Sequence, residues 1–460
     1  MNFSKNKITK KGTENQTINS THSLSKISGK EVEVSFSHDR ISSDGGILLL
    51  KEVENQIGII DVLAKSIKDE RHPSYIEYGL NEIISQRVYQ IAAGYEDAND
   101  CNYLKEDSVL KMCVGRNPQS DNNLATQSTM TRFENSVTRE DLYNIANEFV
   151  LHFMKSYEKA PELIILDCDD TDDITHGQQE LSVYNTYYGS SCFMPLHIYE
   201  GISGKLITTI LKTGTRSKGE FVFSIIKRIV KKLRQTWKKT IIIVRGDSHF
   251  CSTKLMSWSQ EQENVHFLTG LTGNSKLHAL SEVTKQSAER EYKQTNKNVV
   301  RYHTFDYQAV SWTEAQRVIV KVAVTEKGTD LRYVVTDMYE YRTQKLYELG
   351  YCSRGKMELY IKDHKTYLQS DRTSCHRWEA NQLRLFLHSA AYILIHTFQK
   401  TVLTGTQFYN STMDTIQKRI LKVAASVKEM KTKIKVELPI SCPEQSVFEK
   451  VFRIFEVLRC

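Results

Sequence analysis

Acidic side chains directly follow two apolar runs of strand length. LIILDCDD places Asp167, Asp169 and Asp170 behind one run, and IIIVRGD places Asp247 behind the other. Reacting groups in α/β sheets lie beyond the carboxyl ends of strands, so these acids are candidates for an active site. If the two strands are neighbours, carboxylates converge there and raise each other's pKa unless a cation intervenes. Since only oxygen ligands are present, Mg²⁺ or Mn²⁺ fits this site better than zinc.

The position of each aspartate along the first strand limits its role. Side chains alternate between the two faces of a strand. Asp167 and Asp169 therefore share one face, and Asp170 points to the opposite face if the strand continues that far. Alternation decides only in part which acid this strand contributes, because Asp167, Asp170 and Asp172 are all close to Asp169 in the sequence.

A third acid, Glu358, lies on a helix that the stretch YCSRGKMELYIKDHK predicts. The residues that share its face at helical spacing are Tyr351, Arg354, Lys362 and Lys365. One carboxylate among cations and a phenol suits a metal ligand whose neighbours hold phosphates. The alternative is a ladder of surface ion pairs without a catalytic role.

The elements around these acids predict a mixed α/β sheet wrapped by helices. FMPLHIYEGISGKLITTILKTG is typical of two strands joined at a turn, and EFVFSIIKRIVKKLRQTW of an amphipathic helix. LMSWSQEQE then predicts a helix and VHFLTGL a further strand, which completes a layered α/β arrangement. Beyond about residue 275, RYHTFDYQAVSW and RVIVKVAVTE alternate in polarity, which indicates a β-rich insertion.

Composition narrows the class of protein. The 460 residues carry a net charge of +7, and basic residues cluster between Lys218 and Lys239 and between Lys418 and Lys435. Such clusters are expected of surfaces that meet a polyanion, although a solvated helix face has the same composition. The nine cysteines are scattered singly, which argues against a disulfide framework or a cysteine-rich zinc site. We expect a soluble, unexported protein in a reducing cytoplasm, with no segment apolar enough to span a membrane.

Several motifs occur together in a fixed order. Tyr351, Arg354, Glu358 and Lys365 form the pattern Tyr, two residues, Arg, three residues, Glu, six residues, Lys. The stretches SSDGGILLLKEV, LDCDDTDDITHGQQE, VRGDSHF and ANQLRLFLHSAAY accompany it. With these motifs the chain resembles the DDE transposases of bacterial insertion sequences, in the group with the YREK signature (the IS-four-like superfamily), and is most similar to its thirteen-eighty branch.

The resemblance implies a ribonuclease-H-like catalytic core interrupted by a β-rich insertion. It implies that Asp169, in a D-x-T pattern, is the first catalytic acid, Asp247 the second and Glu358 the third. Together they would hold two Mg²⁺ or Mn²⁺ ions for phosphoryl transfer. The residues expected to contact DNA are Tyr351, Arg354, Lys362 and Lys365.

The expected partners are double-stranded DNA, as terminal inverted repeats and target, and a second copy of the chain on that DNA. The expected place of action is the bacterial cytoplasm, at the nucleoid. Trp312, in the insertion, has two interpretations: stacking on an unpaired base, or ordinary packing in a core.

The change of sequence texture along the chain predicts six segments. They are a disordered tail (1–30), a helical DNA-binding domain (31–158), the first part of the core (159–274), the β-rich insertion (275–332), the second part of the core with the Glu358 helix (333–400) and a basic helical C-terminal region (401–460).

Two other functions stay open from the sequence. LIILDCDDT also fits the pattern of haloacid-dehalogenase-type phosphatases, with Asp167 as nucleophile and Asp169 as acid and base. The order of the later motifs argues against it, because the GD of VRGD precedes FLTG instead of following it. The second alternative is a catalytically inactive transposase derivative that only binds DNA.

Overall fold

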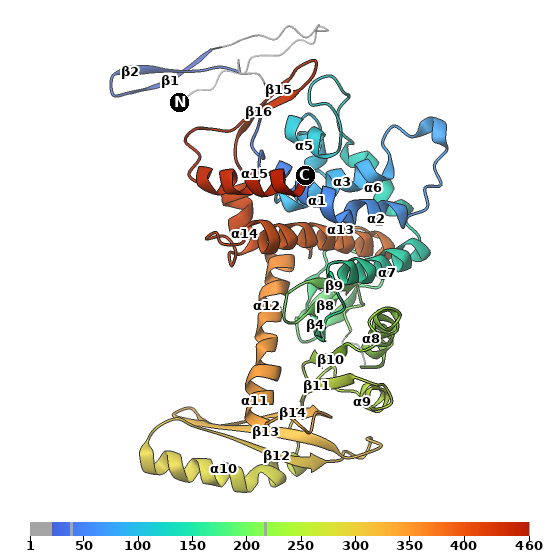
Figure 1. Cartoon of the computed structure of the whole chain (residues 1–460), viewed down its shortest axis with the longest axis vertical. Helices are drawn as coiled ribbons and strands as arrows, with labels where there is room; N and C mark the ends of the chain where they lie inside the picture. The colour runs from blue at the N-terminus through green and yellow to red at the C-terminus, as the bar shows by residue number, and fades with distance from the viewer. Residues whose placement is uncertain (1–20, 37–39, 216–218, 460) are drawn as a thin grey trace, which may run out of the picture.

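The computed structural model describes residues 21–36, 40–215 and 219–459 (Figure 1). Most of the expected disordered tail, residues 1–20, lies outside the described residues. Residues 21–30 differ from that expectation, because β1 (His22–Ile27) and β2 (Lys30–Val34) form an antiparallel hairpin. None of the side chains in this hairpin is buried.

A mixed sheet of eight strands, called the central sheet below, has the order β12-β13-β14-β11-β10-β4-β8-β9. β4, β10 and β11 run parallel to one another, and the other neighbours are antiparallel. The strands are β4 (Leu163–Asp170), β8 (Leu196–Glu200), β9 (Leu206–Ile210), β10 (Ile241–Gly246), β11 (Val265–Leu271), β12 (Val299–Tyr307), β13 (Gln316–Thr325) and β14 (Gly328–Thr336).

Helices cover both faces of the parallel strands, which explains why these strands are continuous apolar runs. On one face, Ile164 and Leu166 of β4 pack in a core with α7 (Arg139–Lys155), α8 (Gly219–Arg234) and α9 (Thr253–Gln260). The mixed α/β sheet with its strands and helices between residues 163 and 271 agrees with the sequence prediction.

The predicted helix that carries Glu358 is a continuous helical segment with changing hydrogen-bond patterns. It consists of α11 (Thr343–Lys345), the π-helix η2 (Leu346–Tyr351), the 3₁₀ turn η3 (Cys352–Arg354), α12 (Gly355–Lys362) and the π-helix η4 (Asp363–Tyr367). Since wide and tight turns shift the angular position of every later residue, simple helical spacing does not hold along the whole segment.

The segment expected to be a β-rich insertion differs in two ways. It begins with a helix of 21 residues, α10 (Ser275–Thr295), which the sequence did not predict. Its strands β12, β13 and β14 extend the central sheet beyond β11 and do not form a separate sheet. Only Leu277, Ser281 and Ala288 of α10 are buried, so its apolar pattern is weak in the sequence.

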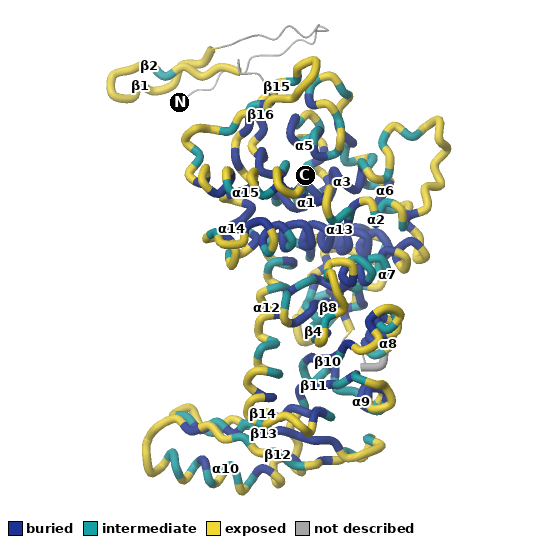
Figure 2. The backbone as a smooth tube through the Cα atoms, viewed as in Figure 1, coloured by how far each residue is buried: buried dark blue, intermediate teal, exposed yellow. Residues whose placement is uncertain are grey.

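The N-terminal helices pack around α13 (Trp378–Thr397), whose residues 379–396 are all buried (Figure 2). These helices are α1 (Ile47–Ile57), α2 (Ile59–Lys65), α3 (Leu80–Ala92), α4 (Asp100–Leu104), α5 (Ser108–Cys113) and α6 (Gln127–Ser136), with a short 3₁₀ turn, η1 (Pro73–Tyr75). Between residues 31 and 158 the described chain is thus mainly helical after β2 and β3 (Ile41–Ser42), and the role of this segment as a separate DNA-binding domain stays a prediction.

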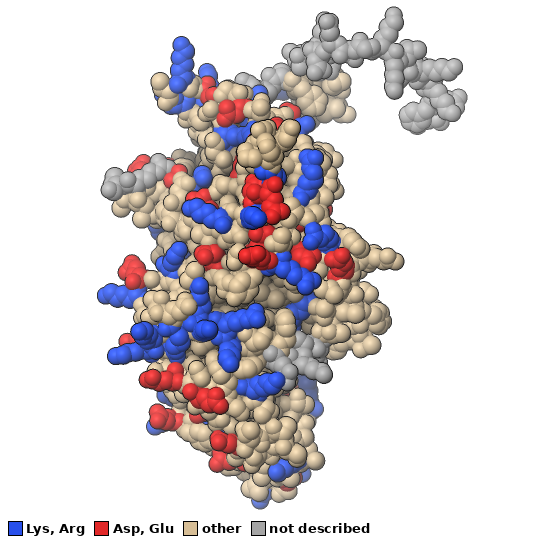
Figure 3. Space-filling model, turned by 90° about the vertical axis from the view of Figure 1, so that its right-hand side faces the viewer, with Lys and Arg blue, Asp and Glu red and all other residues tan. Residues whose placement is uncertain are grey.

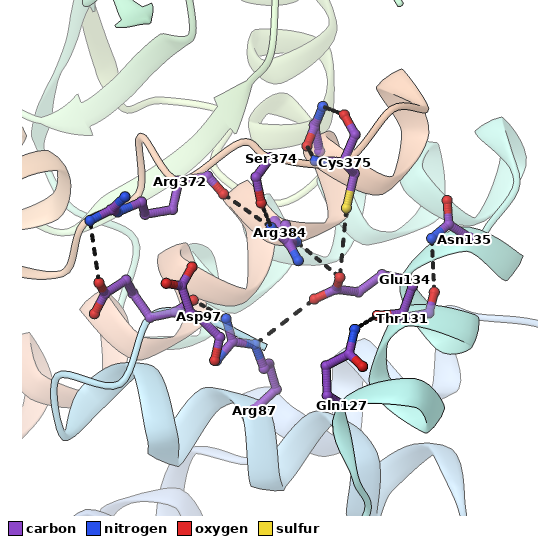
Figure 4. Close-up of polar contacts among 12 residues, drawn as sticks. Arg87, Asp97, Gln127, Thr131, Glu134, Asn135, Arg372, Ser374, Cys375 and Arg384 are labelled. Atoms are coloured by element: carbon purple, nitrogen blue, oxygen red, sulfur yellow. Dashed lines mark hydrogen bonds and ion pairs between the residues drawn. The ribbon is translucent and has the colours of Figure 1, made fainter. Parts of the chain in front are cut away.

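A buried polar network joins three of these helices (Figure 4). Glu134 on α6 is fully buried and accepts a hydrogen bond of 2.9 Å from Nε of Arg384 on α13. Nε of Arg87 on α3 lies 3.9 Å from the other carboxylate oxygen of Glu134. One carboxylate between two guanidinium groups fixes the mutual position of α3, α6 and α13, because leaving any of these charges unpaired in the core is strongly unfavourable.

The C-terminal region is not purely helical. After η5 (Phe398–Val402), α14 (Met413–Ile416) and η6 (Gln417–Leu421), the strands β15 (Ala425–Glu429) and β16 (Ile434–Glu437) form a sheet with β3 (Ile41–Ser42). The final helix is α15 (Gln445–Arg459). Thus the end of the described chain returns to its N-terminal helices (Figure 1). No helix in the described ranges is long and apolar enough to cross a membrane.

Candidate active site

Asp169 and Asp247 lie side by side where the parallel strands β4 and β10 end. We call these strand ends the acidic edge of the central sheet. β4 and β10 are parallel, and their register pairs Cys168 with Gly246. Asp169 follows Cys168 and Asp247 follows Gly246, so the two acids continue that register by one step. Neighbouring strands are about 4.8 Å apart. The two acids expected from the ends of apolar runs are therefore brought together by strand pairing.

The electrostatic environment of Asp169 reflects this crowding. Burial raises the pKa of Asp169 to about 6; the charge of Arg354 opposes that rise, and the charge of Asp247 adds to it. Asp247 accepts hydrogen bonds from His249, from the backbone N–H at 2.8 Å and at Oδ2 from the ring Nδ1 at 2.6 Å. The edge thus concentrates negative charge that the protein itself only partly neutralises.

The helical segment crosses this edge and is attached to it by two cations. Nη2 of Arg354 donates a hydrogen bond of 2.8 Å to Oδ2 of Asp169. Further along the segment, Nζ of Lys365 donates to Oδ1 of Asp172 at 2.9 Å and to Oγ1 of Thr171 at 3.2 Å. Glu358 lies on α12 between these two attachments, with an exposed side chain.

Tyr351 also reaches the acidic edge, and Gly270 makes room for it. A Cβ atom at Gly270 of β11 would lie 2.7 Å from the hydroxyl of Tyr351 and 2.9 Å from the backbone nitrogen of Ser248. Both contacts are shorter than a side chain tolerates, so glycine is required by this close approach. Burial raises the pKa of Tyr351, which keeps the phenol protonated. Gly270 was not predicted to matter, because its role depends on a helical segment far away in the sequence.

Lys362 differs from the other cations that share the predicted face. Its side chain is exposed, and its Nζ lies 5.5 Å from the ring centroid of Tyr367. The structure therefore brings Arg354, Lys365 and Tyr351 to the acidic edge, whereas Lys362 points to solvent at the end of α12.

Asp167 is occupied by a structural ion pair. Its two carboxylate oxygens accept hydrogen bonds of 2.5 Å from Nε and Nη2 of Arg245, and both side chains are fully buried. Arg245 also donates to the carbonyl of Gly350 and to the hydroxyl of Ser353. This arginine, within VRGD, fastens the helical segment to β10. An arginine inside an otherwise apolar strand was the available signal in the sequence.

Asp170, the last residue of β4, is held by a lysine. Its Oδ2 accepts a hydrogen bond of 2.6 Å from Nζ of Lys212, which lies just beyond β9. Both side chains are largely buried. Burial raises the pKa of Asp170, Lys212 lowers it, and the charge of Asp247 adds to the rise, so Asp170 also lies near Asp247. The side chain of Asp169 is 18% exposed and that of Asp170 is 13% exposed.

The acids match the chemistry of a hard divalent cation, but they do not form a complete set of ligands. Asp169 and Asp247 offer the oxygen atoms that Mg²⁺ and Mn²⁺ prefer. Among the residues that the structure describes, no three His, Cys, Asp or Glu side chains lie close enough together to hold a metal ion. Arg354 and His249 already engage the two aspartates, and Glu358 points outward. A cation at this edge would therefore compete with Arg354 for Asp169.

Trp312 lies away from the acids. Its ring packs edge-on against Tyr307, with centroids 5.3 Å apart. Trp312 follows β12, and the end of β12 lies level with the beginning of β11. Asp247 lies at the opposite ends of the parallel strands, where β10 ends. Of the two interpretations of Trp312, packing agrees with this position.

The fold and the site together define a mixed α/β protein with an acidic edge suited to phosphate chemistry. The sequence family described as Transposase DDE domain group 1 matches residues 24–460. The chain belongs to this family and is therefore a DDE-type transposase, a class of enzyme that acts on DNA and generally uses divalent metal ions.

Two further comparisons complete this result. A solved structure with a loosely similar fold is the piggyBac transposase in a synaptic complex with hairpin DNA, studied by cryo-electron microscopy. The TM-score is 0.44 at 11% sequence identity, over 89% of this chain and 85% of that chain. No curated protein matches the sequence.

Proposed function

We propose that this transposase cuts the ends of a bacterial insertion sequence at terminal inverted repeats and joins them to target DNA by two-metal phosphoryl transfer. The observation that carries the proposal is the placement of Asp169 beside Asp247, on adjacent parallel strands. Arg354 and Lys365 attach the Glu358 helix across the same edge. These contacts support a role for Glu358 beside the two aspartates, although its own side chain is exposed.

In this proposal Asp169, Asp247 and Glu358 hold two Mg²⁺ or Mn²⁺ ions. When bound, such ions activate a water or a DNA 3′-hydroxyl and stabilise the leaving oxygen at the scissile phosphate. Arg354 leaves Asp169 and binds a DNA phosphate, and Lys365 binds another. Tyr351 positions the DNA backbone, and Lys362, at the exposed end of α12, contacts it further from the reacting phosphate.

We assign β9, β8, β4, β10 and β11 to the ribonuclease-H-like core that the sequence resemblance implies. The central position of the two strands that carry Asp169 and Asp247 supports this assignment. We further assign residues 31–158 to recognition of the inverted repeats, 275–332 to an insertion within the core, and 401–460 to a basic C-terminal region.

The pattern formed by Tyr351, Arg354, Glu358 and Lys365 supports placing the protein in the YREK group, in its thirteen-eighty branch. We expect two copies to pair two element ends as a homodimer on DNA. We expect that the protein acts in the bacterial cytoplasm, at the nucleoid.

The phosphatase alternative requires Asp167 as a nucleophile. Asp167 is fully buried and both of its oxygens are held by Arg245, so it has neither access to a substrate nor a free lone pair directed at one. We do not favour this alternative. An inactive derivative that only binds DNA would retain binding without cleavage, and the same experiment separates it from an active enzyme.

The test uses a DNA duplex that carries the inverted repeats flanking the gene, incubated with the full chain and Mg²⁺. We expect strand cleavage at the element ends and joining to a second duplex, both lost when EDTA removes the metal. DNA binding without cleavage in Mg²⁺ and in Mn²⁺ would identify an inactive derivative. Hydrolysis of a small phosphomonoester in place of DNA cleavage would overturn the proposal.

A further inference from the structure

The outer face of α8 carries a band of cations. Lys227, Arg228, Lys231, Lys238 and Lys239 are exposed, and Lys232 beside them is half-buried. Within the described ranges, no carboxylate forms an ion pair with any of these six side chains. Figure 3, which shows the face of the molecule to which α8 belongs, has a group of Lys and Arg side chains on its left half.

One basic residue of the same stretch has a structural role and marks the boundary of the band. Arg234 donates to the carbonyl oxygens of Trp237 and Thr240 and to those of Glu263 and Asn264, so it closes the end of α8 against the start of β10. The inner face of α8 is apolar and packs in the core through Val222, Ile226 and Leu233. The exposed cations are therefore not needed to attach the helix to the sheet.

The cations of the band repel one another. Lys227 and Lys231, and likewise Arg228 and Lys232, are like charges four residues apart, which lie on neighbouring turns. The helix dipole favours the cations of the last turn, Lys231 and Lys232, but it does not account for Lys227 and Arg228. Exposed like charges without a carboxylate partner suit a surface that meets a polyanion.

The direction of α8 relates the band to the acids. β9 ends at Ile210, which pairs with Leu196, and Leu196 pairs with Asp170. The chain thus enters α8 from the edge that holds Asp169 and Asp247. After α8 the chain reaches Ile241, the first residue of β10, which pairs with Leu163 at the opposite ends of the strands. Sixteen residues of α-helix span about 24 Å. The band therefore leads away from the acidic edge along the face of the sheet that α8 covers.

We propose that the outer face of α8, with Lys238 and Lys239 beyond it, binds the phosphate backbone of duplex DNA away from the cleavage point. The inference rests on the proposed function, which supplies the DNA. Lysine and arginine that neutralise phosphates give affinity that is independent of sequence and falls steeply with salt. The band holds and orients the duplex, whereas the acidic edge carries out the reaction.

The test compares two triple variants of the full chain that lose the same charge. One is Lys227→Gln, Arg228→Gln and Lys231→Gln on α8; its control is Arg290→Gln, Lys293→Gln and Lys297→Gln, which are exposed residues at the end of α10 and just after it. Fluorescence anisotropy measures the dissociation constant for an element-end duplex over a series of salt concentrations. Circular dichroism checks that each melting temperature equals that of the wild type.

We expect the α8 variant to reduce the slope of log K against log salt by about 3, one for each DNA phosphate that is no longer neutralised, and to weaken binding at least about tenfold at low salt. The control should keep a slope close to that of the wild type. An unchanged slope for the α8 variant, or an equal reduction in the control, would overturn the inference. If the α8 triple variant does not fold, Lys238→Gln with Lys239→Gln, beyond the helix, should reduce the slope by about 2.

This outcome is distinguishable from a failure of the proposed function. If the wild type binds and cleaves element ends while the α8 variant binds with an unchanged slope, only the α8 surface is refuted. If the wild type neither binds nor cleaves them, both proposals fail.

Discussion

Arg354 donates a hydrogen bond of 2.8 Å from Nη2 to Oδ2 of Asp169, across 185 positions of sequence. The guanidinium group thus neutralises an acid that stands beside Asp247 at the end of the parallel strands. In the proposed function Asp169 also holds a divalent cation, which would compete with the positive charge of Arg354 for this carboxylate. We therefore expect metal binding to weaken the Arg354–Asp169 pair and to leave the guanidinium group available to a DNA phosphate.

Arg354→Gln should tighten Mn²⁺ binding in the absence of DNA, because a competing cation is removed from Asp169. Isothermal titration calorimetry measures this, and we expect an affinity about tenfold higher, equivalent to about 1.4 kcal/mol. The same variant should cleave DNA more slowly, since glutamine cannot pair with a phosphate as the guanidinium does. Arg332→Gln is the control, because Arg332 is exposed and pairs with Asp330 on β14. Unchanged or weaker Mn²⁺ binding would contradict the competition.

Asp169→Ala, Asp247→Ala and Glu358→Ala should each abolish Mg²⁺-dependent cleavage of element ends while the fold is retained. The reason is that each removes one of the carboxylates proposed to hold the metal ions. A gel assay with end-labelled duplex measures cleavage, and thermal melting confirms folding. Glu282→Ala on α10, which changes a half-exposed carboxylate paired with Lys285, is the control and should cleave like the wild type. Normal cleavage by any of the three variants would refute that residue's assignment.

Asp167→Ala should lower the free energy of unfolding of the protein, and not only its activity. It leaves the guanidinium of Arg245 buried without its carboxylate, which costs about 3–5 kcal/mol. Urea denaturation followed by fluorescence measures the loss. The double variant Asp167→Leu with Arg245→Met should recover much of it, because two apolar side chains carry no unpaired charge. A single variant as stable as the wild type would show that the pair is not structural.

Glu54 makes stability depend on pH. It is buried and accepts hydrogen bonds from the backbone N–H groups of Ile59 and Ile60, yet burial raises its pKa from 4.5 to about 7. The folded state therefore holds the proton more tightly than the unfolded state, and stability falls as pH rises from about 4.5 to about 7. Relative to Glu54→Gln, the wild type should therefore lose up to about 3 kcal/mol of unfolding free energy over this range.

The measurement is urea denaturation of both proteins at pH 5 and at pH 8. Glu70→Gln, at an exposed carboxylate, is the control and should track the wild type. A difference between wild type and Glu54→Gln that is the same at both pH values would contradict the burial argument.

Several elements of the fold followed directly from local pattern. LIIL and IIIV form β4 and β10, and the amphipathic pattern of EFVFSIIKRIVKKLRQTW forms α8. α10 was missed, because a helix that buries only three small or medium side chains has a weak apolar period. The strands β15 and β16 were missed within a region interpreted as helical. They are stabilised by pairing with β3, near the other end of the chain.

The sequence by itself determined which residues are able to react: acids placed just after apolar strands, and a helix with a carboxylate among cations. These are local features, since strand alternation and helical period act over a few residues. Only the tertiary structure decided which of them meet. The register of β4 against β10 selects Asp169 as the neighbour of Asp247, and the ion pair with Arg245 reserves Asp167 for the core. The changes of helical pitch before and after α12 set Lys365 against Asp172 and leave Lys362 in solvent. Pairing between strands and burial of charge depend on contacts across the whole chain, and no short stretch of sequence contains them.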